Sequence, residues 1–179
     1  MSTTFSAKVN LSIIFQEVMS GILFTNSNVS KALTEQLDLT PGTADGSINV
    51  AWAKTEVGIG ASVTTVYDLI GVLRDTEGNL LNFDEVVLIA VRNRSSTAAN
   101  VLLVGPDVSN GHGVLGANVG FWNDASDRNI VPADGGSWFV LHCRGGVPAV
   151  AATSDEIAVI TLGGTSANTW DILILGRDN

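Results

Sequence analysis

Charged residues and cysteine are both scarce in this chain of 179 residues. Only 15% of the residues are charged, and 18 Asp and Glu outnumber 9 Lys and Arg, which leaves a net charge of −9. Binding to a phosphate backbone needs clustered Lys and Arg, so we expect no nucleic acid partner. Cys143 is the single cysteine, so neither an internal disulfide nor a multi-cysteine metal site can form.

Long apolar runs are missing as well. No stretch approaches the roughly 18 apolar residues of a membrane-spanning helix. Residues 1–10 contain one lysine and no uninterrupted apolar core, so they do not resemble a secretory signal peptide. We therefore expect no membrane partner, and synthesis in a reducing compartment.

Short apolar or alternating segments are abundant instead, separated by turns rich in Gly, Asn and Asp. Low charge and many Val, Thr and Ser residues favour strands over helices. The spacing predicts an all-β fold: an antiparallel β-sandwich resembling a jelly roll over 31–179, preceded by an N-terminal strand or arm over 1–30. The expected strands lie within residues 5–15, 48–52, 63–69, 80–83, 86–91, 101–104, 130–131, 138–141, 157–162 and 170–175.

The segment 84–105 organises the rest of the chain. It contains two apolar runs, 86–91 and 101–104, joined by the small and polar residues 95–100. Two such runs with a polar linker predict a β-hairpin. Because neither run alternates strictly, we expect both strands to be covered on both faces, as in the middle of a sandwich.

The N-terminal segment alternates between apolar and polar residues over 5–15, which predicts a strand with one apolar side. This strand either completes the sheet of its own subunit or reaches a neighbouring subunit. Further along, Ser30 is placed to cap a short N-terminal helix that would end at Leu37. The apolar residues expected to contact a partner are Phe5, Val9, Leu11, Ile13 and Phe15.

The chain offers no convincing arrangement for catalysis or metal binding. His142 and Cys143 are neighbours on an expected strand, so they point to opposite faces and cannot form a catalytic pair. Asp124, Asp127 and Asp134 could supply oxygen ligands to Ca²⁺, but their spacing does not match an EF-hand, and a solvated turn is favoured. We expect no catalytic, cofactor or metal site, and therefore no enzyme.

Two of the four tryptophans are candidates for a binding surface. Trp52 and Trp170 lie in expected strands and are assigned to the core. Trp122 and Trp138 flank the acidic turn instead, so we expect them to be the more exposed pair. Such a pair could stack on sugar rings, but packing in a protein interface or in the core is the favoured interpretation.

Residues 67–105 and the C-terminal residues 169–179 resemble small virion-associated proteins of tailed bacteriophages. Those proteins show the pattern D-L-x-G-x-L-x-D-x-x-G-x-x-x-x-F, an apolar strand ending in R/K-N, then L-x-V-G, and a closing strand T-x-D-I-x-I-x-G. Residues 1–30 have no counterpart in the pattern, and 106–120 are longer than in it. The matching residues here are Asp68, Leu69, Gly71, Leu73, Asp75, Gly78, Phe83, Arg92, Asn93, Leu102, Val104, Gly105, Thr169, Asp171, Ile172, Ile174 and Gly176.

This resemblance implies a structural protein of the virion. The specific expectation is a capsid decoration (cement) protein that stabilises the head by binding the assembled lattice. It would form a homotrimer, bind the major capsid protein, and lie on the capsid surface after synthesis in the host cytoplasm. The alternative is a carbohydrate-binding module of a tail or head fibre, because a sandwich hosts both roles.

Overall fold

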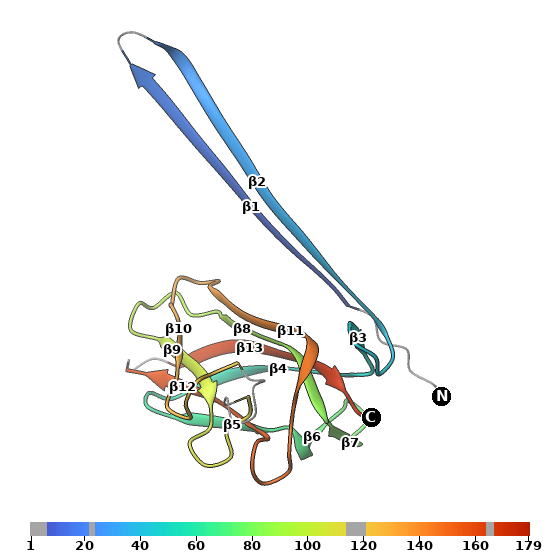
Figure 1. The fold of residues 1–179 in the computed structure, drawn as a ribbon. Coiled ribbons are helices and arrows are strands. Elements are labelled where there is room, and N and C mark those ends of the chain that lie inside the picture. Colours follow the sequence, from blue (N-terminus) through green and yellow to red (C-terminus); the bar gives the residue numbers. More distant parts are fainter. Residues whose placement is uncertain (1–6, 22–23, 114–120, 164–166) are drawn as a thin grey trace.

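A computed structural model describes residues 7–21, 24–113, 121–163 and 167–179, with residues 7–37 described by their backbone alone. Every regular element within these ranges is a β-strand (Figure 1). No helix of the described residues is long and apolar enough to cross a membrane. The fold is a sandwich of two four-stranded antiparallel sheets, from which one long hairpin projects.

We name the two sheets after their central strands. The β8 sheet has the order β11-β8-β13-β4, and the β9 sheet has the order β10-β9-β12-β5. The strands of the β8 sheet are β4 (Val50–Ile59), β8 (Glu85–Asn93), β11 (Trp138–Pro148) and β13 (Asn168–Arg177). Those of the β9 sheet are β5 (Thr64–Asp68), β9 (Val101–Pro106), β10 (Asn129–Val131) and β12 (Glu156–Leu162). A small ribbon of β6 (Ile70–Arg74) and β7 (Leu80–Asn82) lies at one end.

The chain passes from one sheet to the other at almost every connection. Within the sandwich sheets, only β9 and β10 are consecutive strands that pair with each other. Two four-stranded sheets connected in this alternating way form a jelly roll. The predicted all-β, jelly-roll-like sandwich is therefore confirmed.

The predicted hairpin over 84–105 is wrong. Its two apolar runs do form strands, but β8 and β9 belong to opposite sheets, so the linker is an arch over the edge of the core. The side chain of Asn93 fixes this arch by donating hydrogen bonds to the carbonyls of Asn100 at 2.9 Å and of Val131 at 3.1 Å. Val131 lies in β10, so this amide bridges the two sheets. A hairpin and an arch have the same apolar pattern, and only tertiary contacts separate them.

The main core lies between the two sheets. It is built from alternate residues of both, with Trp122, Leu69 and Phe83 closing the ends. A second apolar cluster covers the outer face of the β8 sheet. It consists of Leu39, Ile48, Val87, Leu88, Ala90 and Leu175. Strand β8 is therefore buried on both faces, as its continuous apolar run predicts.

The N-terminal hairpin consists of β1 (Ala7–Gly21) and β2 (Phe24–Pro41), and β2 continues into a short parallel pairing with β3 (Ser47–Ile48). The strand predicted from residue 5 is confirmed over its described part, 7–15. The short helix predicted over 30–37 is wrong, because this segment pairs with β1 along its whole length. A capping signal at one serine does not outweigh a continuous ladder of antiparallel pairs. Strand β2 also runs through the expected arm boundary at residue 30.

Candidate protein–protein interface

The base of the β1–β2 hairpin lies against the sandwich near β3, and we call this base the root. Beyond the root, the hairpin diverges from the outer face of the β8 sheet (Figure 1). Strand β1 has 15 residues, so the hairpin is roughly 50 Å long at about 3.4 Å per residue. Its strands contact mainly each other, and beyond the hairpin β2 contacts mainly β3. The hairpin is therefore an arm attached to the body at one end.

The register of the arm places most of its large apolar positions on one face, together with Glu35 and Lys31, which pair with Leu11 and Phe15. Val9 pairs with Leu37, and Ile13 pairs with Leu33. Directly opposed residues of an antiparallel pair share one face of the ribbon, as do residues two apart on a strand. This apolar face is continuous with Leu39, whose side chain is 2% exposed in the cluster on the β8 sheet.

Of the predicted partner-binding residues, Phe5 lies outside the described part of the chain. The other four, Val9, Leu11, Ile13 and Phe15, occupy alternate positions of β1, where the backbone alone is described. Their common face follows from the register, and their contact with a partner stays a prediction.

The root is fixed by a buried arginine near the C-terminus. Arg177 is 1% exposed and donates hydrogen bonds to the carbonyls of Ala44, at 2.8 Å, and Gly145. Its Nε lies 2.6 Å from Oε2 of Glu85. The Nε–H direction does not have hydrogen-bond geometry, so this contact is an ion pair. The turn after β2, the bulge in β11 and the start of β8 therefore meet at one side chain.

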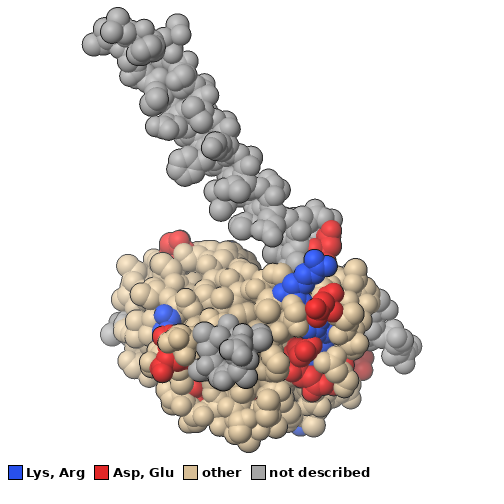
Figure 2. Space-filling model, viewed as in Figure 1, with Lys and Arg blue, Asp and Glu red and all other residues tan. Residues whose placement is uncertain are grey.

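Glycine is required where Arg177 crosses β11. Gly146 has a φ of +75°, and a Cβ at this position would collide with the guanidinium of Arg177. The register shift between His142 and Val147 makes this part of β11 a bulge within a continuous strand. Figure 2 shows charged side chains gathered beside the root, whereas most of the remaining face is uncharged.

An apolar row crosses the outer face of the β8 sheet at the edge of the second apolar cluster, here called the root cluster, and the two ends of the row are exposed. The register aligns Val140 with Ala90, Ala90 with Leu173, and Leu173 with Ala53 across all four strands. Val140 is 47% exposed and Ala53 is also exposed, whereas Ala90 is 5% exposed and belongs to the root cluster. The apolar surface thus continues outward from the cluster that Leu39 covers.

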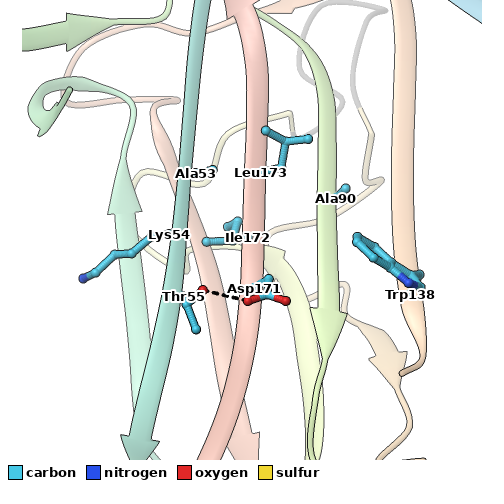
Figure 3. A pocket seen from close by; sticks show the side chains of 8 residues that line it. All are labelled: Ala53, Lys54, Thr55, Ala90, Trp138, Asp171, Ile172 and Leu173. Carbon is cyan, nitrogen blue, oxygen red and sulfur yellow. Dashed lines mark hydrogen bonds between the residues drawn. The ribbon is translucent and has the colours of Figure 1, made fainter. Parts of the chain in front are cut away.

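A shallow groove of about 370 Å³ follows this row (Figure 3). Its lining includes Ala53, Ala90 and Leu173, with Trp138 on the β11 side. The guanidinium carbon of Arg92 lies 5.6 Å from the centre of the Trp138 ring, a distance typical of a cation–π contact. The groove therefore has an apolar floor and one large aromatic wall. Its remaining side is polar, since Lys54, Thr55 and Asp171 also line it and the Thr55 hydroxyl donates to Asp171 at 2.8 Å.

The two tryptophans expected to be exposed have different environments. Trp138 is 59% exposed, as predicted, at the wall of this groove. The prediction for Trp122 is wrong, because Trp122 is 4% exposed and packs in the main core, with Phe121 at a ring distance of 5.7 Å. An apolar residue beside a long polar loop gives no local sign of burial. The two rings do not form an exposed pair.

The acidic residues around Trp122 hold their own turns. Asp124 accepts hydrogen bonds from the backbone and hydroxyl of Ser126, at 2.8 and 2.6 Å, and these bonds lower the pKa of its carboxyl. Asp134 accepts similar bonds from Ser137, at 2.6 and 2.7 Å. Asp127 accepts bonds from the backbone amides of residues 123 and 124. These carboxylates therefore stabilise the turns in which they lie, as their spacing in the sequence favours.

Cys143 is half-buried and His142 is exposed, on opposite faces of β11 as expected. The other histidine, His112, is fully buried, and its Nδ1–H donates one hydrogen bond to the carbonyl of Ser154 at 3.2 Å. Burial lowers its pKa to about 4, so this imidazole is neutral in the folded protein. Its environment is that of a structural core residue.

The residues that carry the phage resemblance have structural tasks. Asp75 accepts hydrogen bonds from the backbone amides of Glu77 and Asn79, at 2.9 and 2.8 Å, and so shapes the β6–β7 turn. Asn93 fixes the arch between the sheets. A Cβ at Gly176 would collide with the carbonyl of Glu85, so β13 passes β8 closely only with glycine there. These three motif residues therefore shape a turn, the arch between the sheets and the pairing of β13 with β8.

Arg177, Leu39 and the groove residues were not predicted from the sequence. A lone arginine in the last strand is expected to be a solvent-exposed charge. An alanine in a strand does not indicate a binding surface. No protein-family model and no curated protein matches this chain. The resemblance to phage virion proteins therefore depends on the motif residues alone.

Proposed function

We propose that this chain is a virion structural protein of a tailed bacteriophage. Its specific role would be that of a capsid decoration (cement) protein, a homotrimer that binds the major capsid protein on the surface of the head. The motif residues over 67–105 and 169–179 support the phage assignment. The observation that carries the attachment role is the arm over 7–41, which projects from a complete jelly roll.

The physical chemistry of the arm supports a partner. A two-stranded ribbon is at best marginally stable in water, since it lacks a third strand or a covering layer. Its register gathers aliphatic residues on one face. Burying a Val, Leu, Ile or Phe side chain contributes roughly 1.5–3 kcal/mol before the cost of ordering. Several such residues on one face are enough to hold an arm in an assembly.

A decoration protein needs no chemistry to stabilise a shell. It binds the assembled lattice and not the separated subunits, so mass action shifts the equilibrium toward the lattice. At a free concentration 100 times the dissociation constant, each bound site would contribute about 2.7 kcal/mol. The jelly roll serves as the body, and the arm supplies the attachment.

The first test is a count of this chain against the major capsid protein in purified heads. A decoration protein is present in many copies, in a fixed ratio to the lattice. Heads that contain none of it, or only a few copies, would refute the proposal.

The second test removes the arm and keeps its root. Lys8 pairs with Asp38, so residues 9–37 can be replaced by Asn-Gly, a two-residue turn suited to a hairpin. We expect the variant to retain the unfolding transition of the jelly roll and to lose head binding. Full occupancy on heads would show that the arm is dispensable, and an unfolded variant would show that the arm is part of the core.

The carbohydrate-binding alternative now depends on Trp138 alone. Its ring is exposed beside the groove, whereas Trp122 is buried. A glycan array tests this role directly. Binding that is lost in Trp138→Ala would favour the fibre module, and an array without hits would remove it.

A further inference from the structure

We propose that the groove on the outer face of the β8 sheet receives the β1–β2 arm of a second copy of this chain. The groove is the one lined by Ala53, Ala90, Leu173 and Trp138. This inference rests on the proposed function, since it names the partner of the same arm. It assigns the arm to contacts between copies, before any contact with the capsid lattice.

The root of the arm shows what this face of the sheet accepts. Leu39 of β2 and Ile48 of β3 are 2% and 1% exposed, and both pack against Leu88 and Leu175 on the outer face. Leu88 and Leu175 pair with each other one row below Ala90 and Leu173, on the same side of the sheet. The groove is thus the direct continuation of a surface that already binds Leu39 of this hairpin and Ile48 of the adjoining β3.

The arm presents the matching pattern. Positions 37, 33, 13 and 9 share the hairpin face of Leu39, and all four are Leu, Ile or Val. The same face also carries Leu11 opposite Glu35 and Phe15 opposite Lys31, so its apolar part includes two charged positions. Sheets pack face to face about 10 Å apart, with side chains of the two layers interdigitating. A floor containing Ala53 and Ala90 leaves room for larger residues from an incoming ribbon. The interface would therefore be a third layer added to the sandwich.

The arm of the same subunit does not fill its own groove. Arg177 holds the turn after β2 through Ala44, and the β1–β2 arm diverges from the sheet (Figure 1). Val140 and Ala53, at the two ends of the row, are left exposed. An arm roughly 50 Å long extends past a four-stranded sheet, whose width is about 19 Å at 4.8 Å per strand. A second copy is the nearest source of a complementary apolar face.

Cross-linking between two different single-cysteine proteins tests the contact. In the full chain with Cys143→Ala, one protein carries Ile13→Cys on the arm and the other carries Ala53→Cys in the groove. The two are mixed and treated with a bismaleimide whose spacer tolerates a small shift in register. We expect a heterodimer of Ile13→Cys with Ala53→Cys. The control partner is Val66→Cys, on the outer face of the β9 sheet, where we expect no product.

The result that overturns the inference is equal yield with the groove and control partners, or no product with either. A double variant, Ile13→Cys with Ala53→Cys in one chain, tests whether the groove is occupied by the arm of its own subunit. A product of monomer mass from this variant at every protein concentration would show that the arm folds onto its own groove, and it would also overturn the inference.

A matched pair of charge substitutions tests the exposed end of the apolar row beside the groove without cysteines. Val140 and Val66 are valines on edge strands of the two sheets, 47% and 43% exposed, so glutamate is tolerated by the fold at both. We expect Val140→Glu to weaken self-association by roughly tenfold or more, because it places a charge in an apolar interface. Val66→Glu should associate like the wild type. Equal association of both variants and the wild type would overturn the inference.

These measurements use purified protein without heads, so they separate the two proposals. Loss of self-association in Val140→Glu with heads that lack the protein would reject the decoration role and keep the arm exchange. Normal head occupancy with no arm-to-groove product would reject the arm exchange and keep the decoration role.

Discussion

Replacing Arg177 with Met should destabilise the whole protein, because this side chain joins three segments at the root of the arm. Arg177 is 1% exposed and donates to the carbonyls of Ala44 and Gly145. It also pairs with Glu85 at 2.6 Å. Methionine fills a similar volume but supplies no donor, so both carbonyls and one carboxylate lose their partner.

The size of the effect follows from these three contacts. A hydrogen bond to a charged group contributes about 1.5–3 kcal/mol, and removing one member of a buried ion pair costs about 3–5 kcal/mol. Glu85 has 27% of its side chain exposed and regains some water, so the lower end of that range applies. Asp45, at 3.5 Å from Arg177, is 81% exposed and adds little. We expect a loss of about 3 kcal/mol in the free energy of unfolding.

Urea unfolding followed by tryptophan fluorescence measures this loss. For a chain of this size, about 3 kcal/mol corresponds to a fall in Tm of roughly 6–12 °C. The matched control is Arg74→Met, because Arg74 also donates to a backbone carbonyl, that of Gly78 at 2.8 Å, but in an exposed turn. The control should change stability by no more than about 0.5 kcal/mol. Arg177→Lys should lie between the two, since lysine keeps the charge but not the planar fork.

Equal stability of Arg177→Met and Arg74→Met would refute this reasoning. It would mean that the segments at the root are held by the apolar cluster around Leu39 and that the buried arginine is replaceable. A change in the m-value without a change in midpoint would instead locate the effect in the unfolded chain.

Three further predictions concern the body of the protein. Tyr67→Phe should cost about 2 kcal/mol in urea unfolding, because the buried Nε1 of Trp170 donates to the Tyr67 hydroxyl at 3.0 Å and would lose its acceptor. Asn93→Ala should cost about 3 kcal/mol in the same assay, because it removes the bond to Val131 that ties the two sheets; a cost under 0.5 kcal/mol would contradict the role of the arch. His112 has a folded pKa of about 4, below its unfolded value of about 6.5. The free energy of unfolding should therefore keep its full His112 contribution above pH 6.5 and fall by about 3 kcal/mol toward pH 4. His112→Gln should lose this part of the pH dependence, and identical pH profiles of the variant and the wild type would contradict the assignment.

The sequence determined the class of fold and most of the strands. Alternation over 5–15 and the unbroken apolar run over 86–91 are local patterns, and they correspond to β1 over its described part and to β8, which is buried on both faces. The short spacing between turn residues excluded helical connections. These features are predictable because period and turn chemistry act over a few residues. The candidate site was predictable only to the extent that one face of the N-terminal strand is apolar and Trp138 is exposed.

Three predictions failed where a distant partner decides the outcome. The segment 30–37 is a strand because β1 pairs with it, although Ser30 alone suits a helix cap. The segment 84–105 is an arch because β9 joins the other sheet. Trp122 is buried because the core closes over its ring. In each case the local preference is small compared with the free energy of pairing or burial.

The sequence by itself thus established an acidic, strand-rich chain with an apolar N-terminal face and no local catalytic pattern. Only the tertiary structure decided which strands share a sheet, that the N-terminal strands form an arm, and that Arg177 anchors it. It also aligned Val140, Ala90, Leu173 and Ala53 in one row, although they come from four strands far apart in the chain. The physical reason is that the strand period is local, whereas register and burial depend on contacts between residues that the sequence separates widely.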